Sequence, residues 1–148
     1  MRSTVLVGAL LCACGATEVH EVIVPVHRLA QVDASQLVGF ELWILDQVGR
    51  DDAPIDCARL LSRALSPLDD NVVRLRDPIV GAIGGEVKIG DILAGAQNRI
   101  FYVDVFANDE LLGARVAAGC TQSVTIVGGK DTRVAISLVP PPPPSLSR

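Results

Sequence analysis

The run RIFYVDVFA, at residues 99–107, decides the fold of this chain. Its apolar side chains alternate with other residues, which is the pattern of a strand with one face buried. The face expected to point inward carries Phe101, Val103, Val105 and Ala107. An acidic turn at 108–110 is expected to reverse the chain, so that residues 111–116 run back beside the first strand.

Further segments with the strand pattern lie on both sides of this hairpin. Residues 123–127 and 132–139 flank the turn Gly128-Gly129-Lys130-Asp131, and Val134, Ile136 and Leu138 are expected to face inward. Residues 36–45 (QLVGFELWIL) place Val38, Phe40, Leu42 and Ile44 on one face. On the other face, Trp43 lies with Glu41 and is expected to be half exposed. Short strands at near-regular spacing predict a mostly β domain over 22–139, an antiparallel β-sandwich.

The remaining elements are shorter. Residues 21–26 form an edge strand at best, because Pro25 has no N–H for the ladder. Residues 71–75 and 86–89 are short strand candidates on either side of a glycine-rich loop at 81–85. Residues 57–65 (CARLLSRAL) have helical spacing, with Asp56 as the expected cap and Pro67 as the stop. One short helix is therefore predicted, and Pro140–Pro144 is expected to end the domain.

Composition limits the function classes. The 148 residues are enough for one domain with a core, and 49% of them are apolar although only 3% are aromatic. The net charge is −4, and the Lys and Arg residues are scattered rather than clustered. A surface that follows nucleic acid phosphates needs clustered positive charge, so nucleic acid is excluded as a partner.

The N-terminus has the pattern of an export signal. Arg2 precedes an apolar stretch at 4–11 that is too short to span a bilayer. The residues Leu11-Cys12-Ala13-Cys14 resemble the lipobox of bacterial lipoproteins. That resemblance implies residues 1–13 as signal peptide, a lipid on Cys14 that anchors the protein to a membrane, and 14–21 as a short tether. Ordinary export to the periplasm or medium, or a buried first strand in a cytoplasmic protein, are the alternatives.

Two further features come from resemblance to bacterial lipoproteins. In Gram-negative lipoproteins, Asp after the lipidated cysteine retains the protein at the inner membrane. Gly15 stands there in this chain, which implies the outer membrane. Residues 91–109, Gly119-Cys120 and the closing 134–138 strand look like the C-terminal half of immunoglobulin-like or prealbumin-like sandwich domains of uncharacterised lipoproteins. That family has no agreed activity to transfer.

Two cysteines remain once Cys14 carries lipid and Cys12 has been removed. Cys57 and Cys120 are then an even pair in an oxidising compartment, which predicts a disulfide rather than two free buried thiols. A metal site is disfavoured, because two distant cysteines with no nearby histidine supply too few ligands.

A search for catalytic chemistry identifies no residue set. The only histidines are His20 and His27, and a hydrolase triad would have to use His27, whose neighbours Val26 and Arg28 give no indication of one. Residues 128–132 (GGKDT) depart from a phosphate loop and are better explained as a hairpin turn. The pairs Asp51-Asp52 and Asp69-Asp70 lack calcium-loop spacing and are interpreted as solvated loop charges. No catalytic, cofactor or metal residue is predicted.

The sequence therefore predicts a non-enzymatic binding or structural module of the cell envelope, with an unknown envelope protein or ligand as partner. A small-ligand carrier with an apolar cavity between the sheets is the alternative function. Residues 140–148, which contain five consecutive prolines, are expected to be a solvated polyproline tail rather than a docking peptide.

Overall fold

The computed structural model describes residues 22–28, 39–82, 86–90, 95–107, 115–128 and 130–141. Within these ranges lie eight strands and one helix, so the predicted mostly β class with a single short helix is confirmed. The helix is α1 (Cys57–Leu61). The strands are β1 (Val22–Arg28), β2 (Gly39–Asp46), β3 (Ile79–Ala82), β4 (Glu86–Ile89), β5 (Gly95–Phe106), β6 (Arg115–Ile126), β7 (Thr132–Arg133) and β8 (Ile136–Val139).

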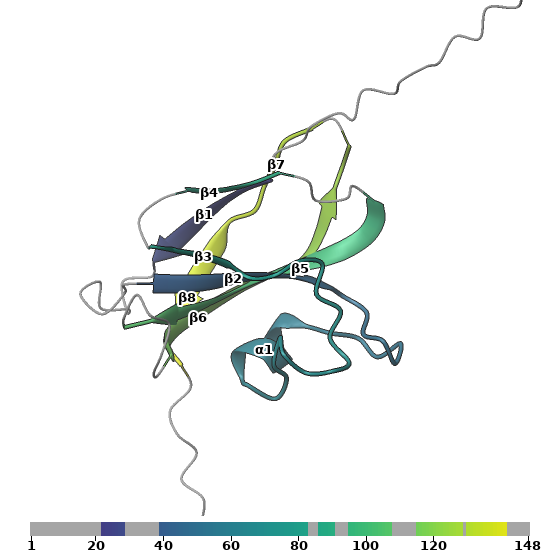
Figure 1. Ribbon diagram of the computed structural model, residues 1–148, viewed down its shortest axis with the longest axis horizontal. Coiled ribbons are helices and arrows are strands. Elements are labelled where there is room, and N and C mark those ends of the chain that lie inside the picture. Colours follow the sequence, from purple (N-terminus) through teal and green to yellow (C-terminus); the bar gives the residue numbers. More distant parts are fainter. Residues whose placement is uncertain are drawn as a thin grey trace, which may run out of the picture.

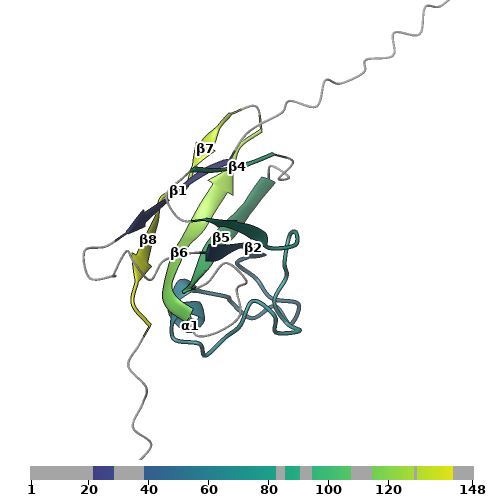
Figure 2. The ribbon, with the colours of Figure 1, turned by 60° about the vertical axis from the view of Figure 1, so that its left-hand side comes forward.

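The strands form one sheet that folds over itself into two facing layers. Its order is β3-β2-β5-β6-β8-β1-β4, and β7 also pairs with β1. Figure 1 shows β1, β4 and β7 on one side of the long strands, with α1 and its loops on the opposite side. In Figure 2, β5 and β6 extend from α1 at one end to β4 and β7 at the other. The long strands are therefore covered on both faces.

An inner core fills the space between the two strand layers. The register sets Leu42 of β2 opposite Val103 of β5, and Ile44 opposite Phe101, so the alternation seen in the sequence points inward as predicted. Ala107 is the exception, because it lies beyond the end of β5 and is exposed. The inner core consists of Phe40, Leu42, Ile44, Ile89, Phe101, Val103, Val105, Ala117, Ile126, Val134, Ile136 and Leu138.

An outer core lies on the opposite face of β2 and β5, beneath α1. Its members are Trp43, Leu45, Ile55, Leu60, Leu65, Val72, Ile100, Tyr102 and Ala118. The expectation that Trp43 is half exposed was wrong, since only 6% of it is accessible. The reason is that the segment 47–78, between β2 and β3, folds back and covers this face of the sheet. The alternation of residues within a strand does not predict such a cover.

β1 is an interior strand of the sheet, and the prediction of an edge strand was wrong. It pairs antiparallel with β4 on one side and parallel with β7 and β8 on the other. Pro25 is tolerated because it is the last residue paired with β4 and lies in the gap between the β7 and β8 ladders. The strand continues beyond the predicted end at residue 26, through His27 and Arg28.

β6 is one long strand where the sequence predicted two. It runs from Arg115 to Ile126 and pairs with β5 through several register shifts, so Gly119 and Cys120 lie inside the strand. Gly119 permits close approach of β8, because a Cβ there would lie 2.5 Å from Cγ2 of Ile136 and 2.9 Å from the carbonyl oxygen of Ser137. One register shift lies between the pairs Arg99–Val124 and Phe101–Thr121, and Ser123, at this irregularity, has a φ of 60°.

Three smaller predictions need correction. Residues 71–75 are not a strand, because they contribute only an isolated bridge between Arg74 and Leu45. Gly81, expected in a loop, belongs to β3, which pairs with β2. The helix ends at Leu61 rather than Leu65, although Asp56 caps it as predicted by accepting a hydrogen bond from the Arg59 N–H at 2.8 Å. The strand over 86–89 is present as β4.

The ends of the domain are only partly visible. β8 ends at Val139, and Pro140 and Pro141 are exposed. The predicted signal peptide at 1–13, Cys14, the predicted tether at 14–21 and most of the proline-rich tail lie outside the described residues. In the part of the chain that is described, no helix has the length and hydropathy of a membrane span.

Candidate functional site

A disulfide fastens α1 to the outer face of the sheet. It joins Cys57, the first residue of α1, to Cys120 in β6, with 5.5 Å between their Cα atoms, as the cysteine count predicted. The backbone N–H of Cys57 also donates to the side-chain oxygen of Gln122 at 2.8 Å. Leu60 then packs into the outer core with 1% exposure. The position of the helix is therefore set by a covalent bond, a hydrogen bond and apolar packing.

The chain after α1 forms a rim over the same face. Arg63 adopts a left-handed conformation with φ of 63°, and its N–H donates to the carbonyl of Leu60 at 3.2 Å. Leu65 is buried in the outer core, and the N–H of Ser66 donates to a carboxylate oxygen of Asp69 at 2.8 Å. These contacts hold residues 63–67 beside α1 and leave a pocket between them and β5.

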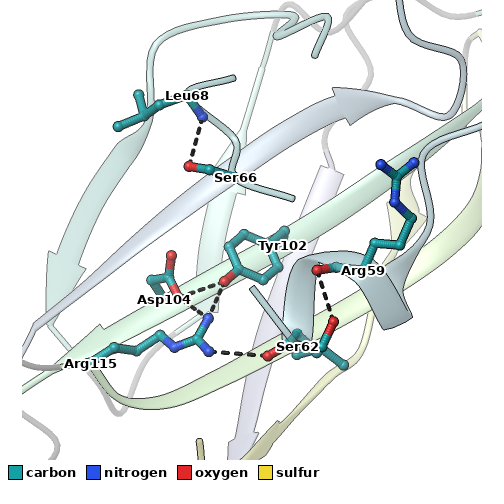
Figure 3. A network of polar contacts seen from close by, with 8 residues as sticks. Arg59, Ser62, Ser66, Leu68, Tyr102, Asp104 and Arg115 are labelled. Carbon is teal, nitrogen blue, oxygen red and sulfur yellow. Dashed lines mark hydrogen bonds and ion pairs between the residues drawn. The ribbon is translucent and has the colours of Figure 1, made fainter. Parts of the chain in front are cut away.

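A polar network forms the floor of this pocket. Arg115, at the start of β6, has only 3% of its side chain exposed and pairs with Asp104 of β5 at 2.9 Å. Its guanidinium also donates to the Tyr102 hydroxyl and, at 3.1 Å, to the carbonyl of Leu61 in α1. Figure 3 shows Arg115 reaching from β6 to Tyr102 and Asp104 and on toward the helix. One arginine thus ties both long strands to α1.

The electrostatics of the network fix its protonation state. Burial raises the pKa of Tyr102, and the nearby Asp104 carboxylate raises it further, although Arg115 opposes both effects. The Tyr102 hydroxyl donates to Asp104 at 2.7 Å, which requires the protonated form. Glu41 lies opposite Asp104 in the β2–β5 register, and its pKa is also raised, first by burial and then by Asp104. Tyr102 is therefore neutral at physiological pH.

The pocket has a volume of about 290 Å³. Its polar wall consists of Arg63, Ser66, Tyr102, Asp104 and Arg115. Its apolar wall consists of Leu60, Leu65, Pro67 and Phe106. Within the described residues, the Nε atom of Arg115 is buried without a hydrogen-bond partner. The pocket combines charge with apolar surface, which is the usual character of a small-molecule site.

A second cavity of about 340 Å³ lies at the other end of β2 and β5. Asp46, Gln47, Val48, Pro54 and Asn98 line it. Asp46 is already paired with the buried Arg99, its cross-strand neighbour. The only charge in this lining is thus engaged in an ion pair, so the cavity offers a ligand less than the pocket under α1 does.

The residues weighed from sequence as catalytic or metal-binding are not brought together. His27 lies in β1 opposite Ser137, and His20 lies outside the described residues. A carboxylate oxygen of Asp51 accepts from the Ala53 N–H at 3.2 Å, and Asp69 accepts from Ser66, so both stabilise loops. After β6, the Lys130 N–H donates to the carbonyl oxygen of Val127 at 3.4 Å, which is a turn contact. Among the described residues, no cluster of three or more His, Cys, Asp or Glu side chains has the arrangement of a metal site.

Sequence reasoning missed the Tyr102, Asp104 and Arg115 network. The sequence held an indication of two members. Tyr102 and Asp104 carry polar groups, and they lie on the strand face opposite Phe101, Val103 and Val105 in an otherwise mostly apolar run. Arg115 carried no comparable signal, since it was predicted to lie within a returning strand. Comparison with known proteins adds no relative, as no family model, curated protein or solved structure matches this chain.

Proposed function

We propose that this chain is a lipid-anchored protein of the bacterial cell envelope, held at the outer membrane through Cys14, that acts as a non-enzymatic binding or structural module. The observation that carries the proposal is the Cys57–Cys120 disulfide. Disulfides persist in oxidising compartments, and the lipobox-like segment Leu11-Cys12-Ala13-Cys14 directs a protein to such a compartment. The disulfide and the lipobox-like segment are far apart in the sequence, and both are consistent with an oxidising compartment.

The state of the polar network supports binding over catalysis. The hydroxyl of Tyr102 donates to Asp104 and accepts from Arg115, so it is engaged on both sides. Its raised pKa keeps it protonated, which opposes a role as nucleophile or base. The same oxygen of Asp104 accepts from Tyr102 and Arg115. These residues act as structural ties that shape a surface.

The packing between the strand layers favours a binding surface outside the sandwich over a carrier cavity within it. Inner-core side chains fill that space, and Leu42, Phe101, Val103, Ile136 and Leu138 are 0% exposed. Both cavities described above lie away from this core. We therefore place the proposed binding role on the face that carries α1.

The anchor is tested by replacing Cys14 with Ser. We expect the variant to lose incorporation of labelled palmitate and to leave the detergent-extracted membrane fraction or accumulate as precursor. Cys12→Ser is the matched control, because Leu11 is too bulky for the position before a lipidated cysteine, and it should be labelled like the wild type. A Cys14→Ser protein that is still acylated and membrane-bound contradicts the proposal.

The compartment is tested separately on the same strains. Thiol alkylation of whole cells before lysis should leave Cys57 and Cys120 unmodified in the wild type, and prior reduction should make both reactive. Two alkylated thiols without reduction would place the domain in a reducing compartment, whatever the result at Cys14.

A further inference from the structure

The pocket under α1 has a net positive wall. Arg63 and Arg115 line it against a single carboxylate, Asp104. Asp104 is paired with Arg115, so these two charges largely cancel. The side chain of Arg63 makes no hydrogen bond or ion pair with any residue that the structure describes. Arg63 is therefore the cation available to a ligand.

The position of Arg63 is fixed although its side chain is exposed. It lies two residues after the end of α1, and its N–H donates to the carbonyl oxygen of Leu60, a residue that is 1% exposed. Six residues before Arg63, the disulfide at Cys57 holds the first turn of α1 to β6. The guanidinium thus projects from a fastened backbone, and a ligand need not order this loop on binding.

The apolar lining and the volume of the pocket determine what the uncharged part of the ligand can be. Leu60, Leu65, Pro67 and Phe106 supply the apolar part of the lining, and of these Phe106 is partly exposed whereas the other three are buried. A volume of about 290 Å³ is at the lower limit for small-molecule sites. Such a pocket suits a small molecule with one charged end and an apolar body. A guanidinium matches a carboxylate best, because its planar fork donates two parallel hydrogen bonds.

We propose that this pocket binds a small organic carboxylate, with the carboxylate against Arg63 and the apolar body against Phe106, the partly exposed member of the apolar lining. Glu41 pairs with Asp104 across the β2–β5 ladder, so its side chain lies on the same face as Asp104, although it does not line the pocket. The inference deepens the proposed binding role and is independent of the lipid anchor.

The test is calorimetric titration of the purified protein, in detergent if it is extracted from membranes. The probes are hexanoate, the neutral hexanamide and the cationic hexylamine. We expect hexanoate to bind and the other two to bind at least about tenfold more weakly, the effect of losing a charge-assisted hydrogen bond. Absence of hexanoate binding, or equal binding of the amide or amine, overturns the proposal. Phosphate binding as tightly as hexanoate would mean a general anion site and also overturns it.

Two arginine variants locate the site. Arg63→Gln should weaken hexanoate binding about tenfold or more, whereas Arg50→Gln, an equal charge change at an exposed residue outside the pocket, should leave it unchanged. Backbone amide shifts on titration should concentrate at residues 60–67 and be absent at 127–130. Shifts elsewhere, or equal effects of the two variants, contradict the assignment. Palmitate labelling is unaffected by any of these outcomes, so failure here leaves the anchor proposal standing.

Discussion

The two cores of this domain are built on the same two strands by different means. The inner core is wholly apolar, and strands supply all of its members except Val134, which lies between β7 and β8. The outer core includes Trp43 and Tyr102, lies against a short helix and irregular loops, and is closed by a disulfide and the Arg115 network. Strand pairing builds the first, whereas the second depends on a few individual bonds. The contrast indicates that the outer core is the part most easily lost.

Removal of the disulfide is expected to have the largest effect on this contrast. The bridge spans 63 residues, and the loop-entropy relation gives a loss of about 4 kcal/mol for the Cys57→Ala/Cys120→Ala variant. Because Trp43 is the only tryptophan and lies in the outer core, its fluorescence reports that core directly. Urea unfolding should show the fluorescence change before the loss of strand circular dichroism. Coincident transitions at the wild-type midpoint would contradict the difference between the cores.

Breaking the buried ion pair should come next. In Asp104→Asn, Arg115 keeps its charge in a position with 3% side-chain exposure and loses its carboxylate partner. We expect a loss of about 2 kcal/mol, somewhat below the range for removing a partner completely, since the amide oxygen still accepts a hydrogen bond. Asp70→Asn, the same charge change at an exposed loop residue, is the control. Equal unfolding free energies for the two variants would mean that the network adds nothing to the outer core.

The pH at which Tyr102 ionises tests how well the outer core excludes solvent. Its pKa is raised in the folded protein, first by burial, so its contribution to stability is complete below the unfolded value of about 10 and declines as pH rises above it. Tyr102 is the only tyrosine, so near-ultraviolet absorbance follows it alone. We expect tyrosinate to form only together with loss of circular dichroism. Ionisation near pH 10 in a protein that remains folded would show that the outer core admits solvent.

The smallest expected effect is at Glu41. Burial and Asp104 raise its pKa, so its charged form is disfavoured in the fold, and stability due to Glu41 falls as pH rises above its ordinary value of 4.5. Glu41→Gln should therefore raise the unfolding free energy at pH 7 by less than about 0.5 kcal/mol, because solvent screens this partly exposed group. The gain should vanish at pH 3. A loss of stability at pH 7 would mean that the hydrogen bond with Trp43 outweighs the repulsion.

The two cores also differ in how far the sequence predicts them. Alternation in 99–107 identified the inward faces of β5 correctly, because a strand repeats every two residues and its buried side is apolar. The same reasoning gave the wrong exposure for Trp43, because both faces of a strand that is covered on both sides are buried, and alternation then no longer separates a buried face from an exposed one. It also misjudged β1, because the position of a strand within a sheet depends on distant partners. Arg115 was missed for that reason as well, as its carboxylate partner and helix carbonyl belong to other elements.

The place of β8 in the sheet has a kinetic consequence. Among the described strands, β8 alone pairs both with β6 in one layer and with β1 in the other. Its partner in β1 is 110 residues away, as the pair Val26–Ile136 shows. Contacts of such long range slow folding, because loop-closure entropy is lost before the contacts form. The sandwich therefore cannot close until β8 (Ile136–Val139) has been synthesised. By then Cys57 and Cys120 are both available, so oxidation can shorten the search before the last strand docks.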